Sequence, residues 1–432
     1  MSTHSNKKVE LMAPLKNFKS LNAALKNADA VYFGVESLNM RMFSDNFKLE
    51  DLNKIVSICH ENNVKAYLTT NVVIYENEIE LTERILTKAF EAEIDAVIIH
   101  DIGAIELAKN QGLKFHISTQ ANVSNTLSAK FYETLGAERL ILARELSLEQ
   151  IKEIRKKLKK CEIETFIHGA QCTSISGRCY FSAEICESQD YSANRGKCIQ
   201  PCRKKWKVYD DENNEFIYDG VFFINAKDLC MIEHIPLLIE ANIDAFKIEG
   251  RMRDPIYIEE VTKCYREAID AYYENTFTTQ KLQEWLTRLK KVYNRGFSTG
   301  FYFGLPKGSE IEREREGNIS DFRKVEIGKV ISYFPEKSAA KIILTRGTLK
   351  LGDEIFIVGT HTDTYLHQNI QSIQIKRKQN LTETPQASKN KTITVGILVD
   401  EPVKKNDRIF KLDSMNKNNQ IELIKNLKKK KK

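Results

Sequence analysis

From about residue 9 to residue 250 the chain alternates short apolar runs with amphipathic segments. Runs such as DAVYFGV and IDAFKIEG are apolar at successive positions, which is typical of strands that are buried on both faces. The segment LEDLNKIVSICHENN, which lies between two such runs, has apolar residues at helical spacing. This alternation predicts a parallel sheet with helical crossovers. Eight or nine units within about 250 residues favour a (β/α)8-type barrel over an open doubly wound sheet.

Polar or glycine residues follow nearly every predicted strand. Active sites of such barrels are built at the carboxyl ends of the strands, so a ring of these residues predicts a functional pocket. No GxGxxG follows the first strand, which argues against a dinucleotide-binding fold. The predicted strands are VELMAP, DAVYFGV, VKAYLTTNV, IDAVIIHD, LKFHISTQ, RLILARE, IETFIHG, VFFINAKD and IDAFKIEG. The ring residues are Gly34, Asn71, His100, Asp101, Gln120, Glu145, His168, Lys227, Asp228, Glu249 and Arg251.

The pattern changes twice after the predicted barrel. DPIYIEEVTKCYREAIDAYYEN and QKLQEWLTRLKKVYN predict a helical extension, and short alternating runs from about residue 321 predict a small antiparallel β-barrel. LKLGDEIFIVG in this part resembles the second, β-barrel domain of translation elongation factors, which points towards RNA. The expected parts are a disordered N-terminus (1–8), an α/β barrel catalytic domain with the helical extension (9–305), a C-terminal β-barrel domain (320–420) and a basic tail (421–432).

Composition and charge narrow the class of protein. A chain of 432 residues with 42% hydrophobic and 29% charged residues is ordinary for a globular protein. The N-terminus lacks the apolar segment of a signal peptide, and no apolar run approaches the roughly 20 residues that span a bilayer. We therefore expect a cytoplasmic protein without membrane contact.

Basic residues gather in three clusters of a chain whose net charge is +7. They are RKKLKK (Arg155–Lys160), CRKKWK (Cys202–Lys207) and the terminal KNLKKKKK. Such clusters attract phosphates, although a solubilising face and a frayed tail are the simpler interpretation for the terminal lysines. CRKKWK is the better candidate for an RNA-facing surface because it lies beside the cysteines.

The densest chemistry lies between Cys172 and Cys230, where cysteines are spaced C-x6-C-x18-C-x3-C-x27-C with Cys186 inside the second gap. In a chain without signs of secretion, such thiols are more often metal ligands or reactive groups than disulfides. Sulfur ligands in fours select zinc or iron–sulfur clusters, and the close C-x2-C pairs of zinc ribbons are absent. The spacing favours a 4Fe–4S cluster, with zinc, redox thiols and inert residues as alternatives. His168, just before the motif, is either structural or an acid/base group.

The segment ETFIHGAQCTSISGRCYFS resembles the signature of peptidase family U-32, which runs E-x-F-x-x-G-[SA]-x-C-x4-G-x-C-x-x-S. Gln171 and Phe181 stand where the family usually has aliphatic residues. The blocks NRGKCIQPCR, NAKDLC, FKIEGRMR and NRGFSTGFYFG are also similar to the family, so the resemblance covers most of residues 9–305. The matching signature positions are Glu164, Phe166, Gly169, Ala170, Cys172, Gly177, Cys179 and Ser182.

This resemblance implies two kinds of enzyme. The family name implies a collagenase-like peptidase, whereas other branches are oxygen-independent hydroxylases with a 4Fe–4S cluster. These branches act on wobble uridine of tRNA with prephenate as the implied hydroxyl source, on a cytidine of 23S ribosomal RNA, or on ubiquinone precursors. The β-rich tail favours the RNA branches, and tRNA first. The resemblance implies the cluster ligands Cys172, Cys179, Cys198 and Cys230, with Cys202 as an alternative to Cys198.

The leading hypothesis is therefore a tRNA hydroxylase that forms 5-hydroxyuridine, with an electron donor of unknown identity. We expect Lys227 and Arg251 to hold the carboxylates of a small acidic co-substrate, and Trp206 to stack on an extruded base. The expected pocket residues are Glu145, His168, Lys227, Asp228 and Arg251.

Two rival hypotheses come from other classes. A peptidase needs an activated nucleophile or a metal-bound water, and the sequence has neither GxSxG nor HExxH, which leaves a cysteine paired with His168. An RNA-binding module would use a cluster or zinc as a structural element only, and the ring of polar strand ends argues against it.

Overall fold

The computed structural model describes residues 8–217, 221–375 and 379–414. Contacts within the chain divide it into two compact units. One unit runs to Leu289 and includes Tyr293–Ile319, and the other holds Lys290–Val292 and the chain from Ser320 onwards. The predicted disordered N-terminus (1–8, apart from residue 8) and the basic tail (421–432) lie outside the described residues.

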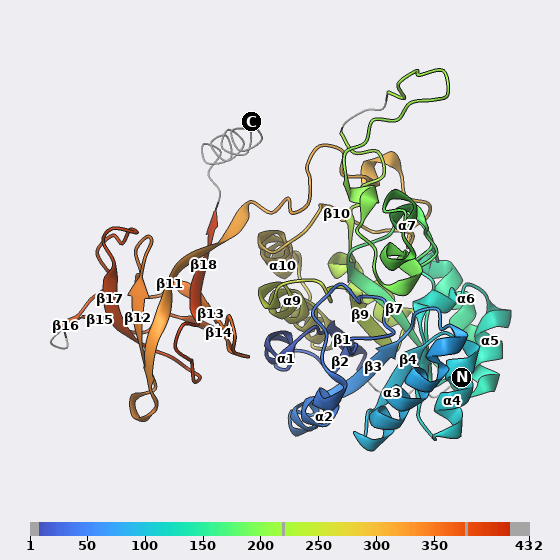
Figure 1. Ribbon diagram of the computed structural model, residues 1–432, viewed down its shortest axis with the longest axis horizontal. Coiled ribbons are helices and arrows are strands. Elements are labelled where there is room, and N and C mark those ends of the chain that lie inside the picture. Colours follow the sequence, from blue (N-terminus) through green and yellow to red (C-terminus); the bar gives the residue numbers. More distant parts are fainter. Residues whose placement is uncertain (1–7, 218–220, 376–378, 415–432) are drawn as a thin grey trace. The chain divides into compact units, whose positions relative to one another are not determined.

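The first unit is a closed barrel of eight parallel strands, which confirms the predicted fold class (Figure 1). Its strands are β1 (Glu10–Pro14), β2 (Ala30–Phe33), β3 (Lys65–Thr70), β4 (Ala96–Ile99), β5 (Phe115–Ile117), β6 (Arg139–Ile141), β7 (Glu162–Gly169) and β9 (Ala245–Ile248). Its helices are α1 (Phe18–Ala24), α2 (Leu52–Glu61), α3 (Ile79–Glu91), α4 (Ile102–Asn110), α5 (Thr126–Leu135), α6 (Leu148–Lys157), α7 (Phe181–Ile185), α8 (Ile235–Glu240), α9 (Pro255–Tyr273) and α10 (Thr279–Lys291).

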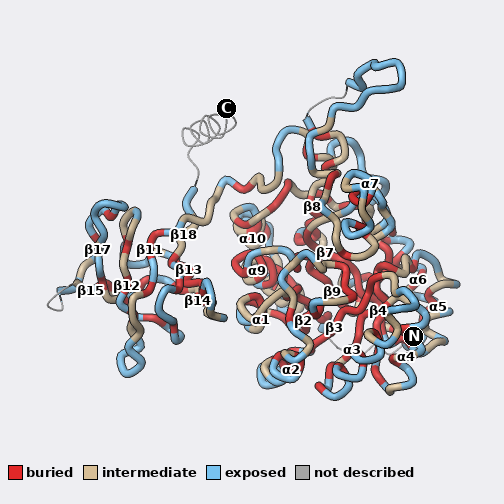
Figure 2. Tube along the Cα trace, viewed as in Figure 1, coloured by how far each residue is buried: buried red, intermediate tan, exposed pale blue. Residues whose placement is uncertain are grey.

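Neighbouring strands pair in sequence order from β1 to β7, and β9 closes the ring by pairing with both β1 and β7. Every residue of β1, β2, β4 and β9 is buried, because one face of each strand points into the barrel and the other lies under the helices (Figure 2). This double burial explains why the strands are apolar at successive positions.

Side-chain caps start several of the helices that follow strands. The carboxylate of Asp101 accepts a hydrogen bond from the backbone N–H of Ala104 at 3.2 Å and so caps α4. Asp254 caps α9 in the same way, with Pro255 at the first helical position. Asp101, which the sequence placed in the ring of polar strand ends, thus serves the helix.

One predicted strand, VFFINAKD, is not part of the barrel. Its backbone pairs with residues 310–313, and only the three residues of β8 (Asp228–Cys230) form a strand. β8 runs antiparallel to the end of β7 and also pairs with β10 (Phe297–Ser298). The run was mistaken for a barrel strand because it is equally apolar, but the place beside β7 in the ring belongs to β9.

The second unit is an antiparallel sheet around its own apolar core, as predicted for the C-terminal part. Its core includes Val330, Ile342, Ile355, Val395 and Ile409. The strands are β11 (Phe322–Phe334), β12 (Ala339–Leu344), β13 (Glu354–Val358), β14 (Tyr365–Asn369), β15 (Gln374–Ile375), β16 (Gln379–Asn380), β17 (Ile393–Leu398) and β18 (Arg408–Ser414), in the order β14-β13-β18-β11-β12-β17-β15-β16.

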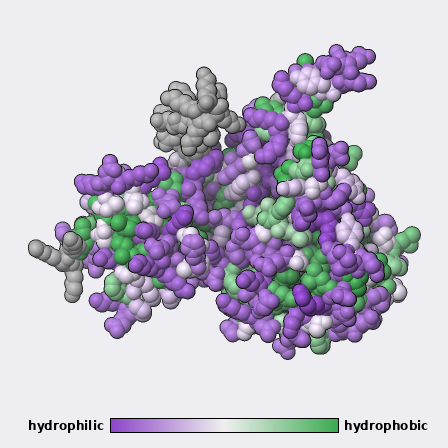
Figure 3. All heavy atoms as spheres, viewed as in Figure 1, coloured by the Kyte–Doolittle hydropathy of each residue, from purple (hydrophilic) through white to green (hydrophobic). Residues whose placement is uncertain are grey.

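Polar side chains dominate the visible face of the molecule, with apolar patches scattered among them (Figure 3). Among the described residues, no helix has the length and apolar character needed to cross a bilayer.

Candidate active site at the carboxyl ends of the barrel strands

A pocket opens among the carboxyl ends of the barrel strands, where the sequence predicted a functional site. Its lining includes three arginines and one lysine, opposed by a single carboxylate, that of Glu249. The lining residues are Tyr32, Met40, Arg41, Thr69, Asn71, Ile98, Ser118, Thr119, Gln120, Ile141, Arg144, Phe166, Lys247, Glu249 and Arg251.

Two arginines converge on Glu249. Its Oε2 lies 2.9 Å from Nη2 of Arg41 and 3.4 Å from Nη2 of Arg144. Burial would raise the pKa of Glu249, but the charges of Arg41, Arg144 and Arg251 outweigh burial and lower it, so the carboxylate stays ionised. Arg144 also lies over the ring of Phe166, with 3.8 Å between its guanidinium carbon and the ring centroid.

The third arginine, Arg251, is 3% exposed and has no carboxylate among its hydrogen-bond partners. It donates to the side-chain oxygens of Thr69, Asn39 and Asn46 at 3.2, 2.8 and 2.7 Å. Burial lowers the pKa of Arg251 to about 10. Within the described chain, the buried Nε atoms of Arg144 and Arg251 have no hydrogen-bond partner. Three guanidinium groups around one carboxylate leave surplus positive charge, which suits a small anion.

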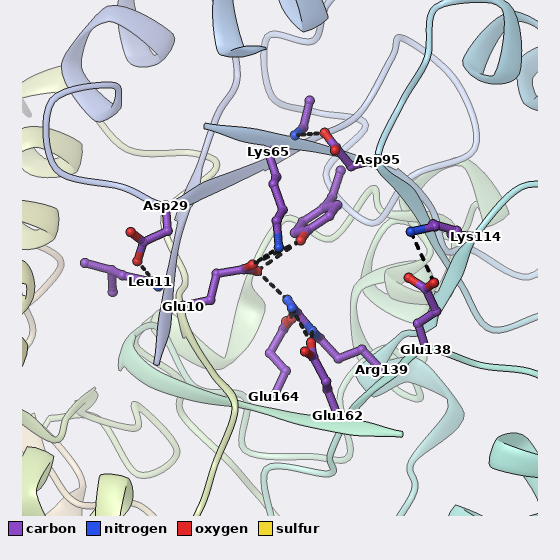
Figure 4. Close-up of polar contacts among 12 residues, drawn as sticks. Glu10, Leu11, Asp29, Lys65, Asp95, Lys114, Glu138, Arg139, Glu162 and Glu164 are labelled. Carbon is purple, nitrogen blue, oxygen red and sulfur yellow. Dashed lines mark hydrogen bonds and ion pairs between the residues drawn. The ribbon is translucent and has the colours of Figure 1, made fainter. Parts of the chain in front are cut away.

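The lysine of the pocket belongs to a network that continues to the other end of the barrel. Lys247 is 4% exposed, and its Nζ lies 2.9 Å from Oε1 of Glu164 and 4.0 Å from the ring centroid of Tyr32. Oε2 of Glu164 lies 3.3 Å from Nη1 of Arg139. Arg139 binds Glu10 as well, with 2.6 Å between Nη1 and Oε1 (Figure 4). Lys247 therefore has Glu164 as its carboxylate partner, whereas the three arginines that line the pocket have only Glu249 among the lining residues.

The family signature has a structural meaning in this site. Glu164 anchors Lys247, and Phe166 supports Arg144. Gly177 has a left-handed backbone (φ +76°), and a side chain there would collide with Oε1 of Gln120, which lines the pocket. Residues of the signature thus support two cations of the pocket, and Gly177 allows the following loop to pack against Gln120.

That loop is part of a cap, residues 170–203, which packs on the mouth of the barrel. Cys172 is exposed, and Cys179, Cys198 and Cys202 are half-buried. Burial raises the pKa of the Cys202 thiol, Arg203 lowers it, and the thiolates of Cys172 and Cys179 raise it further. Burial also raises the pKa of Cys198, with smaller contributions from the other three cysteines. Four thiols therefore lie within electrostatic reach of one another.

The cap thiols also adjoin the arginine pocket. Burial would lower the pKa of Arg41, but Glu249 and then Cys172 are the groups that raise it, and the net shift is upwards. A negative charge on Cys172 is thus felt by a guanidinium that lines the pocket.

Cys230 occupies a different environment. It lies in β8, opposite His168 of β7, and the hydroxyl of Tyr265 donates to its Sγ at 3.8 Å. Burial raises the pKa of Cys230 to about 11, and the largest further contributions come from the backbone of Ile232, the Tyr265 hydroxyl, Glu233 and Asp228. Cys172 and Cys179 contribute to the pKa of both Cys198 and Cys202, so these four thiols influence one another electrostatically.

His168 is packed among aromatic rings. It is 2% exposed, its Nδ1 lies 3.2 Å from the hydroxyl of Tyr265, and the rings of Tyr257 and Phe297 flank it. Burial lowers the pKa of His168 to about 4, so it is neutral at physiological pH. Its surroundings are those of a core residue.

The remaining predicted pocket residues are dispersed. Asp228 is buried and pairs with Arg295, with 3.0 Å between Oδ1 and Nη1. The side chain of Lys227 lies over Gly296 and does not line the pocket. Glu145 is half-buried in the loop after β6 and does not line the pocket, whereas its neighbour Arg144 does. Of the five residues expected in the pocket, only Arg251 lines it.

Sequence reasoning missed Arg41, Arg144 and Lys247. Arg144 and Lys247 stand in predicted strands, one position from Glu145 and two from Glu249. The alternation of side chains along a strand decides which neighbour points inwards, and this signal was present in the sequence. Arg41 follows β2 in a long loop and carries no such signal.

Zinc and an iron–sulfur cluster make different demands on the thiols. Zinc holds four ligands at about 2.3 Å around one ion. Within the part of the chain that the structure describes, no three histidine, cysteine, aspartate or glutamate side chains are placed to hold one ion. A 4Fe–4S cluster binds each thiolate through a separate iron, so its ligands stand further apart. The four cap thiols fit a cluster in number and chemical kind.

The comparisons with known proteins agree with this architecture. A family model described as peptidase family U32 matches residues 16–312. An uncharacterized protease of Methanocaldococcus jannaschii is 43% identical, covering 94% of this chain and 98% of its own. A collagenase of Porphyromonas gingivalis is 37% identical, with coverages of 94% and 98%. The tRNA hydroxylation protein P1 of Bacillus subtilis is 35% identical, with coverages of 84% and 86%.

The family model spans the barrel from α1 to the segment that pairs with residues 221–228, and it includes the cap and its cysteines. The resemblance seen in the signature is therefore confirmed, and the chain belongs to peptidase family U32.

Proposed function

We propose that this protein is an RNA-modifying hydroxylase that forms 5-hydroxyuridine at the wobble position of tRNA. The observation that carries the proposal is the surplus of positive charge in the pocket, whose Arg41 lies within electrostatic reach of Cys172. The tRNA hydroxylation protein among the relatives supports an RNA substrate. Peptide hydrolysis needs an activated nucleophile or a metal-bound water, and three arginines in the pocket supply neither.

The pocket suits a small dianion as the hydroxyl donor, with prephenate, a dicarboxylate, as the proposed compound. Arg144 and Arg251 each have an unpartnered Nε, and Arg41 holds Glu249 beside them. Guanidinium groups pair well with planar carboxylates. Replacing a C–H bond of uridine by C–OH removes two electrons from the base, and a donor whose C–OH bond becomes a C–H bond takes up those two electrons together with the displaced hydrogen. The reaction is thus balanced without oxygen.

A 4Fe–4S cluster is proposed on Cys172, Cys179 and Cys198, with Cys202 or Cys230 as the fourth ligand. Such a cluster, when bound, supplies one-electron chemistry. The mutual influence of Cys172, Cys179, Cys198 and Cys202 on thiol pKa supports Cys202, while the family resemblance implies Cys230. Iron content of Cys202→Ala and Cys230→Ala protein distinguishes the two, because the true ligand is the one whose loss lowers iron.

A peptidase remains the second candidate, because a protease and a collagenase are among the relatives. A cysteine nucleophile needs a lowered pKa and a nearby base. Burial instead raises the pKa of Cys198 and Cys202, and the hydrogen bond recorded for the His168 ring goes to Tyr265. The geometry thus favours the hydroxylase.

The test is hydroxylation by protein that is purified without oxygen. Iron and sulfide are measured, and the protein is incubated with unmodified tRNA and prephenate before mass spectrometry of the nucleosides. About four irons per chain and formation of 5-hydroxyuridine are the expected results. Hydroxycytidine formed only in a 23S rRNA fragment would move the substrate to the ribosome. Metal-free protein that cleaves a defined peptide would overturn the proposal.

A further inference from the structure

Two exposed aromatic rings contact each other at the barrel mouth. Phe43, in the loop after β2, is 47% exposed, and Tyr191, in the cap, is 38% exposed. Their ring centroids are 5.8 Å apart, with 48° between the ring planes. The two rings come from segments far apart in the sequence and form one exposed apolar surface beside the pocket.

The loop that carries Phe43 also builds the pocket. Arg41, two residues earlier, lines the pocket. Ser44, the next residue, donates from its Oγ to the backbone oxygen of Arg251 at 2.8 Å. Asn46 accepts from the guanidinium of Arg251 at 2.7 Å. Phe43 is thus held between residues that line the pocket or contact its arginine.

The segment that carries Tyr191 is fixed to the same loop by backbone contact. Gly196 has a left-handed backbone (φ +71°), and a side chain there would collide with the carbonyl oxygen of Asn39. Arg195 donates to the backbone oxygen of Val73 in the loop after β3. The aromatic pair is therefore held by the packing of its two segments and does not depend on its own weak contact.

Trp206, the residue expected to stack on a base, is engaged elsewhere. Its ring packs on Phe181 with 5.5 Å between centroids, and its Nε1 donates to the backbone oxygen of Pro201 at 2.8 Å. It supports the end of the cap, so its ring packs against the protein and is not presented for stacking on a base.

We propose that Phe43 and Tyr191 form the platform on which an unstacked base of the RNA substrate rests at the entrance of the pocket. Aromatic side chains stack on bases of unpaired RNA regardless of their identity. The surplus positive charge behind the pair attracts the phosphates on either side of that base. This inference rests on the proposed function, because it assumes an RNA substrate.

The test is binding of a fluorescent stem-loop RNA, with an unpaired uridine in its loop, measured by anisotropy. Phe43→Ala and Tyr191→Ala should each weaken binding about tenfold, and Phe43→Trp should preserve it. Phe43→Leu keeps the apolar volume without a flat ring and should weaken binding like alanine. The matched control is Phe131→Ala, because Phe131 is 54% exposed and contacts Tyr132 on α5, away from the mouth.

A second RNA that lacks the loop base separates stacking from other effects. The wild type should bind this abasic RNA about tenfold more weakly, and Phe43→Ala should then cause no further loss. Equal losses with both RNAs, or a Phe43→Leu protein that binds like the wild type, would overturn the platform and leave the proposed function standing. A wild-type protein that does not bind the intact RNA would overturn both.

Discussion

The two ends of the barrel use the same residue types in opposite ways. At the amino ends of the strands, Arg139 is surrounded by the carboxylates of Glu10, Glu162 and Glu164 (Figure 4). Lys65 adds a further charge, 2.7 Å from Glu10. At the carboxyl ends, three arginines share the single carboxylate of Glu249, and two of them have unpartnered nitrogen atoms. One end is neutralised by the fold itself, and the other keeps a surplus of positive charge.

This difference separates stability from function. A buried guanidinium with carboxylates on several sides holds strands together, and removing it leaves those carboxylates buried and unpaired. A buried guanidinium without enough carboxylates costs stability in the free protein, and it is retained for what it binds. The two ends can therefore be tested by matched arginine substitutions.

The largest effect is expected for Arg139→Met. The substitution leaves Glu10 and Glu164, which are 5% and 0% exposed, without their guanidinium partner. Loss of one partner of a buried ion pair costs about 3–5 kcal/mol of unfolding free energy. Urea denaturation measures the loss. Lys88→Ala, which removes only an exposed ion pair with Glu91, is the control and should change stability by less than about 1 kcal/mol. Equal unfolding free energies for Arg139→Met and Lys88→Ala would show that the ion pairs of Arg139 do not stabilise the fold.

The second prediction concerns the stability of the protein at acidic pH. Burial would raise the pKa of Glu10, but Arg139 and Lys65 outweigh it and hold the pKa at about 2, against an ordinary value of 4.5. Between about pH 2 and pH 4.5 the Glu10 carboxyl is therefore protonated in the unfolded chain and ionised in the folded chain. Stability from this carboxylate is present above pH 4.5 and is lost as the pH falls towards 2. The loss is on the order of 3 kcal/mol.

The measurement is urea denaturation of the wild type and Glu10→Gln between pH 6 and pH 3. Glu10→Gln should be less stable at pH 6 and should have a shallower dependence on pH. Parallel curves for the two proteins would show that Glu10 does not carry the ionised charge assigned to it.

At the other end of the barrel, Arg144→Gln should keep the fold and weaken binding of the dianionic donor. Hydrogen bonds to charged groups contribute about 1.5–3 kcal/mol, which corresponds to roughly 10–100-fold in affinity. Calorimetry with prephenate measures the affinity, and urea denaturation should show unchanged or slightly increased stability. A large loss of stability with unchanged affinity would make Arg144 a structural residue like Arg139.

The smallest effect is stabilisation by a simple dicarboxylate. Malonate at about ten times its dissociation constant should stabilise the wild type by about 1.4 kcal/mol, because it binds only the folded protein. The melting temperature of the wild type should rise by a few degrees. Arg144→Gln should lose this rise and Glu10→Gln should retain it. Equal rises in the melting temperatures of both variants would show that malonate does not bind specifically beside Arg144.

Much of the architecture could be predicted from the sequence, because burial on both faces makes parallel strands apolar throughout. The same logic misled at VFFINAKD, since a run of this kind does not reveal its pairing partner. At the site, Arg251 was identified from its place after a strand, but Glu145 was chosen over Arg144. The geometry of Arg41 depends on a loop that packs back on the barrel, and no local pattern encodes that contact.

The most direct test of the account is nucleoside analysis of tRNA from a strain that lacks this gene and carries either the wild type or Arg144→Gln. We predict 5-hydroxyuridine with the wild type and its loss with Arg144→Gln, although both proteins accumulate to the same level and hold the same amount of iron. Unchanged 5-hydroxyuridine in the Arg144→Gln strain, or in the strain with no copy of the gene, would contradict the account.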